Sequence, residues 1–158
     1  MKLSEIVVPG AVIPSLSSVK RDEVVGELID ALVEAGTLRE AWREEVVKAV
    51  LEREKRGSTG FGKGVAVPHV KREKHPSVSL AVGLSPSGVD FNALDKSPVH
   101  SVFLLVSPAE KPEEHLRAME VIFKHLSYEM FRKFLRQAQS REDVLELLRE
   151  ADAQQSGG

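Results

Sequence analysis

Apolar residues recur at helical spacing through the first third of the chain. One stripe falls within residues 19–35, after the candidate caps Ser17 and Ser18 and before Gly36, and consists of Val24, Val25, Leu28, Ile29, Leu32 and Val33. A second stripe follows Thr37, ends at a charged run over residues 52–56 and at Gly57, and consists of Trp42, Val46, Val50 and Leu51. The pattern therefore predicts two consecutive helices, after a short extended stretch at residues 11–14.

The middle of the chain has the pattern of strands. Residues 65–67 form a short β-branched run that stops at Pro68 and His69. Residues 78–84 alternate large apolar with small side chains, which predicts a strand that a helix can approach closely on one face. Residues 99–106 are almost continuously apolar, as is typical of a central strand covered on both faces.

Helical periodicity returns after Pro112. The apolar stripes of this part contain Leu116, Met119, Ile122, Phe123 and Leu126, then Phe131, Phe134 and Leu135, and after Ser140 they contain Val144, Leu147 and Leu148. The order of elements predicts one α/β domain over residues 1–150, with a mixed, mostly short-stranded sheet flanked by helices on both faces. We expect residues 151–158 to be a tail, either disordered or vector-derived.

Composition excludes several classes of function. Twenty-two Lys and Arg residues against 24 Asp and Glu give a formal charge of −2, so there is no overall basic field to attract nucleic acid. The chain has no cysteine, which excludes disulfides, thiolate metal sites and a thiol nucleophile and fits a reducing compartment, so we expect a cytoplasmic protein. The longest apolar run, Val102 to Val106, is far shorter than the roughly 20 residues that span a bilayer, and residues 1–20 have no signal-peptide pattern. We therefore expect no direct membrane insertion.

A glycine-rich loop connects the second predicted helix to the first predicted strand. Residues 57–63, G-S-T-G-F-G-K, satisfy most of the nucleotide-binding pattern G-x-x-x-x-G-K-[ST], but Gly64 stands where Ser or Thr would hold Mg²⁺. The loop also leads from a helix into a strand, the reverse of the order that directs backbone amides at phosphates. We therefore expect no ATP or GTP site. The glycines instead predict tight turns or close approach by another backbone or a phosphoryl group.

His69 follows Pro68 at the carboxyl end of the first predicted strand, where open α/β sheets usually place their ligands. The proline stiffens the backbone that presents the imidazole. A neutral imidazole, with an ordinary pKa of about 6.5, has a free ring nitrogen that could accept a phosphoryl group. A surface histidine at a strand end is the alternative interpretation, and position alone does not decide between them.

Two other side chains could stabilise a phosphoryl group. Arg53 lies near the end of the second predicted helix, and its guanidinium fork matches phosphate oxygens, although a solvated helix-end charge is the alternative. His115 lies in the first turn after Pro112, where unpaired N–H groups favour an anion, although a hydrogen-bonded histidine at the core boundary is the alternative. No histidine spacing typical of a metal site and no G-x-S-x-G motif is present, so metal catalysis and Ser/His/Asp hydrolysis are not expected.

Residues 53–69, R-E-K-R-G-S-T-G-F-G-K-G-V-A-V-P-H, resemble the active-site segment of phosphotransferase-system enzyme IIA domains of the mannitol/fructose type. The G-S-T-G form of the loop is most similar to fructose domains and to the stand-alone nitrogen-regulatory protein. The resemblance continues in the same order through residues 88–95, 98–99, 106–108 and 114–116, and covers nearly all of residues 4–150.

The resemblance implies a phosphocarrier with a mixed sheet flanked by helices. It implies that His69 accepts a phosphoryl group from a histidine-containing phosphocarrier protein, with His115 as a second active-site histidine and Arg53 as the positive group that steadies the phosphoryl. The loop expected to bind the phosphoryl group comprises Ser58, Thr59, Gly60 and Gly62. No metal, nucleotide or other cofactor is expected.

The resemblance leaves three functions open. With no sugar-binding membrane domain and no linker to an enzyme IIB domain visible, we favour the nitrogen-regulatory type, whose phosphorylation state governs a target protein. The alternatives are the IIA component of a fructose or mannitol transport system, which would pass the group to an enzyme IIB domain, and a binding module that does not transfer it. Val70 departs from the Gly or Ala that usually follows the histidine, and we expect a β-branched side chain there either to narrow the access of a partner or to restrict rotation of the imidazole.

Overall fold

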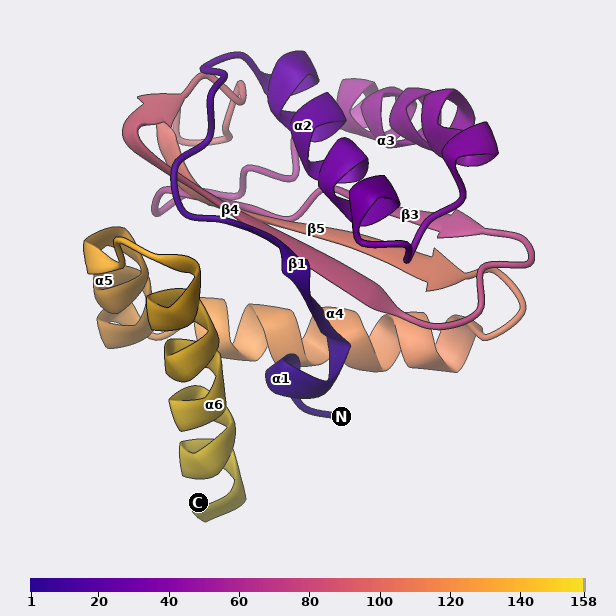
Figure 1. Ribbon diagram of the computed structural model, residues 1–158. Coiled ribbons are helices and arrows are strands. Elements are labelled where there is room, and N and C mark those ends of the chain that lie inside the picture. The colour runs from indigo at the N-terminus through magenta and orange to yellow at the C-terminus, as the bar shows by residue number, and fades with distance from the viewer. Residues whose placement is uncertain (158) are drawn as a thin grey trace.

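The computed structural model describes residues 1–157, in which one mixed sheet lies between two layers of helices (Figure 1). The strands are β1 (Val7–Ile13), β2 (Val65–Ala66), β3 (His69–Arg72), β4 (Ser79–Val89) and β5 (Val99–Pro108). The helices are α1 (Leu3–Ile6), α2 (Arg21–Glu34), α3 (Arg43–Arg56), α4 (Pro112–Leu126), α5 (Glu129–Gln137) and α6 (Arg141–Gly157), with a 3₁₀ turn at Glu40–Trp42. In the described part of the chain, no helix combines the length and the apolar character needed to cross a bilayer.

The sheet has the order β1-β4-β5-β2, and β3 also pairs with β5. β4 and β5 are antiparallel, whereas β1 runs parallel to β4, and both β2 and β3 run parallel to β5. Because Val65 is in register with Ser101 and His69 with Leu105, β2 and β3 occupy successive stretches of the same edge of β5. The predicted mixed, mostly short-stranded sheet is therefore confirmed.

The two faces of β5 pack against different helical layers. Phe103 and Leu105 belong to the apolar cluster that includes α4, α5 and α6, whereas Val102 and Leu104 belong to the cluster that includes α2 and α3. Successive side chains of a strand point to opposite faces, so a strand covered on both sides needs a continuous apolar run. The prediction that residues 99–106 form such a central strand, flanked by helices on both faces, is confirmed.

Pro68 interrupts the edge strand but does not end it. Pro68 has no N–H to donate, so the ladder breaks between β2 and β3. Its carbonyl still accepts a hydrogen bond from the Leu105 N–H at 3.0 Å, which keeps the chain beside β5. His69 was expected at the carboxyl end of a strand, but it is the first residue of β3, which the sequence pattern did not predict.

Helix α6 continues beyond residue 150, where we expected the domain to end. Ala151 and Asp152 are buried, and the Asp152 carboxylate accepts hydrogen bonds from the N–H groups of Leu3 at 2.8 Å and Ser4 at 2.9 Å. The packing of α6 against the short helix α1 therefore includes these two residues of the expected tail. The domain boundary itself stays a prediction, and residue 158 of that tail lies outside the described residues.

Candidate functional site

The imidazoles of His69 and His115 face each other between β3 and the first turn of α4. Their ring centroids are 5.6 Å apart and the ring planes are inclined by 49°. His69 is in register with Leu105, whose side chain faces the α4 layer, so the side chain of His69 points toward α4. The structure thus brings together two of the three side chains that the sequence singled out.

The hydrogen bond of the His69 ring determines which nitrogen keeps a lone pair. Nδ1 lies 2.8 Å from the carbonyl oxygen of Val67. A carbonyl can only accept, so in the neutral ring Nδ1 carries the proton and donates it, and Nε2 keeps its lone pair. The ring is half-buried and follows a proline, so a nucleophilic nitrogen is presented from a stiff support.

His115 is buried and stays neutral at physiological pH. Its Nδ1 lies 2.7 Å from Oγ of Ser107, a buried residue near the end of β5. Burial, together with the nearby charges of His69 and Lys71, lowers the pKa of His115 to about 4. At pH 7 this side chain can therefore donate or accept a hydrogen bond beside His69 without bringing a positive charge.

Lys71 and Ser107 belong to this neighbourhood but were missed from the sequence. Lys71 is exposed, lies two residues after His69 on the same face of β3, and is in register with Ser107. Its charge is close enough to lower the pKa of His115. Ser107 could have been noticed in the sequence as a single serine at the end of an apolar strand. Lys71 could not, because one exposed lysine has no distinctive sequence pattern.

A buried carboxylate, Glu54, holds the glycine-rich loop against the end of α3. It accepts hydrogen bonds from the backbone N–H of Thr59, at 3.0 Å, and from the Thr59 hydroxyl. The Thr59 carbonyl in turn accepts from the N–H of Val67, two residues before His69. Glu54 thus positions the backbone that leads to the imidazole. Glu54 stands in the charged run over residues 52–56, and nothing in the sequence pattern marks it as buried.

The polar groups of Ser58 and Gly60 also hold the loop in place. The Ser58 hydroxyl donates to the Phe91 carbonyl at 3.1 Å and accepts from the Gly60 N–H at 3.0 Å. The Gly60 carbonyl accepts from the Leu94 N–H, and a Cβ at Gly60 would lie 3.0 Å from that of Ala93. The close approach predicted from the glycines is made here by the backbone of residues 91–94. The phosphoryl-binding role of Ser58, Thr59, Gly60 and Gly62 stays a prediction.

Arg53 lies in the last turn of α3, directly before Glu54. Its Nη1 donates to the carbonyl of Gly57 at 2.8 Å, across the start of the loop. Within the described residues this is the one hydrogen bond of the Arg53 guanidinium. The role of Arg53 beside a phosphoryl group therefore stays a prediction. The bond does place one cation where the loop begins.

Val70 does not crowd the imidazole, and that expectation is wrong. Val70 packs against the apolar cluster of α2 and α3, whereas His69 faces α4. The reason is the alternation of side chains along β3. A β-branched residue at this position is therefore compatible with an open approach to His69.

Acid should destabilise the fold through His115. The folded pKa is about 4 and the ordinary value is 6.5, so between these pH values the unfolded chain binds more protons than the folded chain. We expect the free energy of unfolding to fall by about 2 kcal/mol from pH 7 to pH 5, as measured by urea denaturation. Buried His75, whose pKa is also lowered by burial and by Arg72, acts in the same direction. A His115→Gln variant should show a smaller fall, and equal falls would contradict the assignment.

Comparison with known families matches residues 6–151 to the family described as phosphoenolpyruvate-dependent sugar phosphotransferase system, EIIA 2. The chain is 31% identical, over 152 residues, to the PTS system fructose-specific EIIABC component of Bacillus subtilis (strain 168). That match covers 96% of this chain but 24% of the relative, so the chain spans about a quarter of that protein's length.

Two other relatives match over almost their whole length. The nitrogen regulatory protein of Pseudomonas aeruginosa is 31% identical over 148 residues, with 94% of this chain and 95% of the relative covered. The crystal structure of the nitrogen regulatory protein IIA-Ntr from Neisseria meningitidis has a TM-score of 0.82 at 27% identity. The structural match covers 92% of this chain and 98% of the Neisseria chain. Both the sequence and the fold of this chain are therefore similar to those of proteins named nitrogen regulatory protein.

Proposed function

This chain belongs to the EIIA 2 family of the phosphoenolpyruvate-dependent sugar phosphotransferase system, and from that premise we propose that it carries a phosphoryl group on Nε2 of His69. The observation that carries the proposal is the hydrogen bond from Nδ1–H of His69 to the Val67 carbonyl. It leaves Nε2 unprotonated and directs it away from the backbone, as a nucleophile needs.

The proposed reaction moves one phosphoryl group between two imidazoles. Nε2 of His69 attacks the phosphorus of a phosphohistidine on the donor protein, so one P–N bond forms while the donor's P–N bond breaks. The donor ring carries a proton on its other nitrogen, so it leaves as a neutral imidazole when the electron pair of the broken bond returns to it. His69 keeps its proton on Nδ1 and becomes the protonated phosphoimidazole. Little covalent chemistry is required of the surroundings, so catalysis depends on alignment and on stabilising the charge of the equatorial oxygens.

His115 supplies one donor to those oxygens. In the proposed arrangement the Ser107 hydroxyl donates to Nδ1 of His115, so Nε2 of His115 carries the proton. A neutral histidine fits this role because its proton is permanently in place at pH 7. Lys71, on the same face of β3, and Arg53 supply the positive charge.

The surface around the two imidazoles supports a protein as donor. Leu116 follows His115 on α4 and is 60% exposed, and Phe123 is exposed on the same helix. The ring of Phe123 packs on Phe61 of the glycine-rich loop, with a centroid separation of 4.9 Å. Exposed apolar groups beside a polar centre are typical of protein docking sites. We propose a histidine-containing phosphocarrier protein as the donor.

Replacing Leu116 with Asp should slow phosphorylation by the donor protein by at least about tenfold, mainly through a higher KM. The substitution places a charge on the proposed docking surface but leaves the buried face of α4 intact. Initial rates of labelling at several donor concentrations measure the effect. Val19→Asp, which adds the same charge at an exposed position before α2, is the control. An unchanged KM in Leu116→Asp would contradict docking at this surface.

The proposed function is tested by incubating the chain with phosphoenolpyruvate, enzyme I and the phosphocarrier protein, and then measuring its intact mass. We expect a gain of one phosphoryl group that appears only when all three components are present. An unchanged mass would contradict phosphoryl transfer and favour a binding module that has kept the fold.

For the role of the phosphorylated chain we propose regulation of a target protein in the cytoplasm. Support comes from relatives named nitrogen regulatory protein that match almost end to end. The Bacillus subtilis relative, named as a fructose-specific component, favours sugar transport as the second candidate. Adding enzyme IIB domains to the phosphorylated chain distinguishes them: retention of the phosphoryl group favours regulation, and transfer favours transport.

A further inference from the structure

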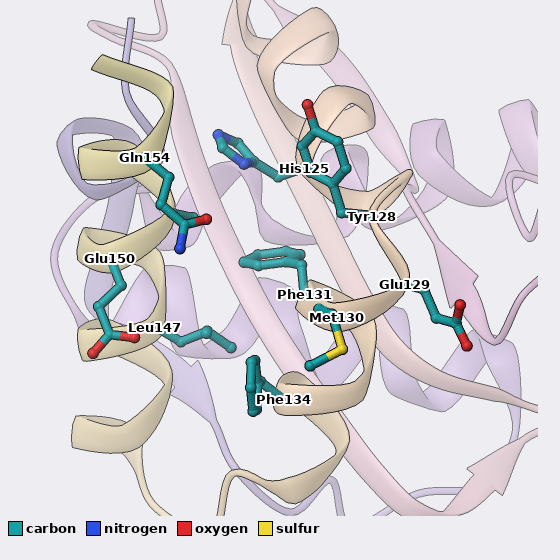
Figure 2. Close-up of a pocket in the computed structure, with 10 residues that line it drawn as sticks. His125, Tyr128, Glu129, Met130, Phe131, Phe134, Leu147, Glu150 and Gln154 are labelled. Atoms are coloured by element: carbon teal, nitrogen blue, oxygen red, sulfur yellow. The ribbon is translucent and has the colours of Figure 1, made fainter. Parts of the chain in front are cut away.

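An apolar groove runs between α5 and α6, on the helical layer below the sheet in Figure 1. Its largest hollow has a volume of about 390 Å³, with Phe131 and Ala151 among its lining residues. Met130 and Phe134 line it from α5 and are 55% and 46% exposed. Figure 2 shows Leu147 extending from α6 toward the rings of α5. Large apolar side chains are thus left uncovered along one continuous surface.

The groove extends along α6 over several helical turns. A second hollow of about 270 Å³ shares Phe134, Leu147 and Glu150 with the first, so the two form one depression. Along α6 its lining extends from Asp143 to Gln154, which corresponds to about 16 Å of helix. That length matches about three turns of a helix laid into the groove, the geometry by which amphipathic helices are commonly bound.

The charged residues that line the groove are all acidic. They are Glu129, Asp143, Glu146 and Glu150. Asp143 accepts a hydrogen bond from the Gln139 N–H, and Glu146 pairs with Arg149 at 3.0 Å. Within residues 1–154, Glu150 makes no ion pair. The cations of α5 line an adjoining hollow with Lys63 of the glycine-rich loop, and they are Arg132, Lys133 and Arg136. That hollow shares Glu129 with the first hollow of the groove and Gln137 with the second, whereas Asp143, Glu146 and Glu150 lie on the α6 side.

We propose that the groove between α5 and α6 binds an amphipathic helix of a partner protein that carries Lys or Arg beside its apolar stripe. The apolar stripe would cover Met130 and Phe134, and the cations would meet the carboxylates along α6. Charge complementarity selects this occupant, because an acidic helix would bring like charges together at the α6 side. The surface is distinct from the one beside His69, so this interaction is independent of the proposed phosphoryl transfer.

The test uses two fluorescein-labelled model peptides of 18 residues. Both carry leucines at helical spacing, and the remaining positions are lysine in one peptide and glutamate in the other. Fluorescence anisotropy with the full chain should show that the lysine peptide binds at least about tenfold more tightly than the glutamate peptide. Equal affinity for the two peptides would overturn the proposal.

Four single variants locate the binding. Phe134→Ser and Glu150→Lys should each weaken the lysine peptide by at least about tenfold. Leu116→Ser is the control for Phe134→Ser and removes an exposed apolar side chain near the N-terminal end of α4. Glu52→Lys is the control for Glu150→Lys and makes the same charge change on α3. These two controls should stay within about twofold of the unmodified chain. Circular dichroism of all four confirms that each is folded.

Two further results would overturn the proposal. If all four variants bind the lysine peptide equally, the attraction is a general one between a cationic peptide and an acidic protein. If sedimentation velocity shows a dimer that Phe134→Ser dissociates, a second copy of the chain occupies the groove. Labelling of Phe134→Ser by the phosphocarrier protein should be unimpaired, which separates failure of this proposal from failure of the proposed function.

Discussion

Replacing His69 with Gln is expected to abolish phosphorylation of the chain, lowering the rate of labelling by at least about 10³-fold. Glutamine approximates the size of the imidazole, and its side-chain N–H₂ can still donate to the Val67 carbonyl, but it offers no nucleophilic nitrogen. Intact mass after incubation with phosphoenolpyruvate, enzyme I and the phosphocarrier protein measures the loss. The variant should unfold at nearly the same urea concentration, because the ring is only half-buried.

His100→Gln is the matched control for this experiment. His100 is on β5, five residues from Leu105 and therefore about 16 Å along the strand from the position paired with His69. Its ring lies against the Ser85 carbonyl and Arg136, away from the two facing imidazoles. We expect full labelling of this variant. Labelling of His69→Gln at the rate of the unmodified chain would refute His69 as the acceptor.

Replacing His115 with Ala is expected to slow transfer by about 10²- to 10³-fold while phosphorylation at His69 still goes to completion. The reason is the loss of one preorganised hydrogen-bond donor to the phosphoryl oxygens. Rapid-quench labelling over time gives the rate, and the final mass gives the extent. The fold should persist, although Ser107 loses its partner at a cost of about 1–2 kcal/mol.

Rescue by a conservative variant separates this role from a purely structural one. The side-chain N–H₂ group of His115→Gln can still donate to the phosphoryl oxygens. Its labelling rate at pH 7 should therefore lie closer to that of the unmodified chain than the rate of His115→Ala does. An unchanged rate at pH 7 in His115→Ala would contradict the role proposed for this imidazole.

Much of the fold could be predicted because its layers depend on side-chain periodicity. The continuous apolar run of β5 required a strand covered on both faces, and the stripe of α4 required a helix with one buried side. The two short elements α1 and β3 could not be predicted in this way. Four residues are too few for a period to be visible, and in β3 the alternation is partly hidden by Lys71 and Arg72.

Site residues that belong to a recognisable motif could be predicted from the sequence. Residues whose contacts depend on the tertiary fold were missed. His69 and His115 were found, and the structure brings them together. Glu54 was missed because its burial depends on the loop folding back onto the end of α3. The side of the sheet on which Val70 lies was misjudged because β3 was not expected. Without a predicted strand, there was no reason to expect the side chains of His69 and Val70 to point to opposite faces of the sheet.

The carbonyl of Val67 has a consequence for the chemical identity of the product. Because it engages Nδ1 of His69, only one of the two phosphohistidine regioisomers, the one substituted at Nε2, can form without breaking that contact. Reagents that recognise a single regioisomer should therefore detect the modified chain uniformly. In nuclear magnetic resonance, the Nδ1 proton should persist before and after modification as a slowly exchanging signal.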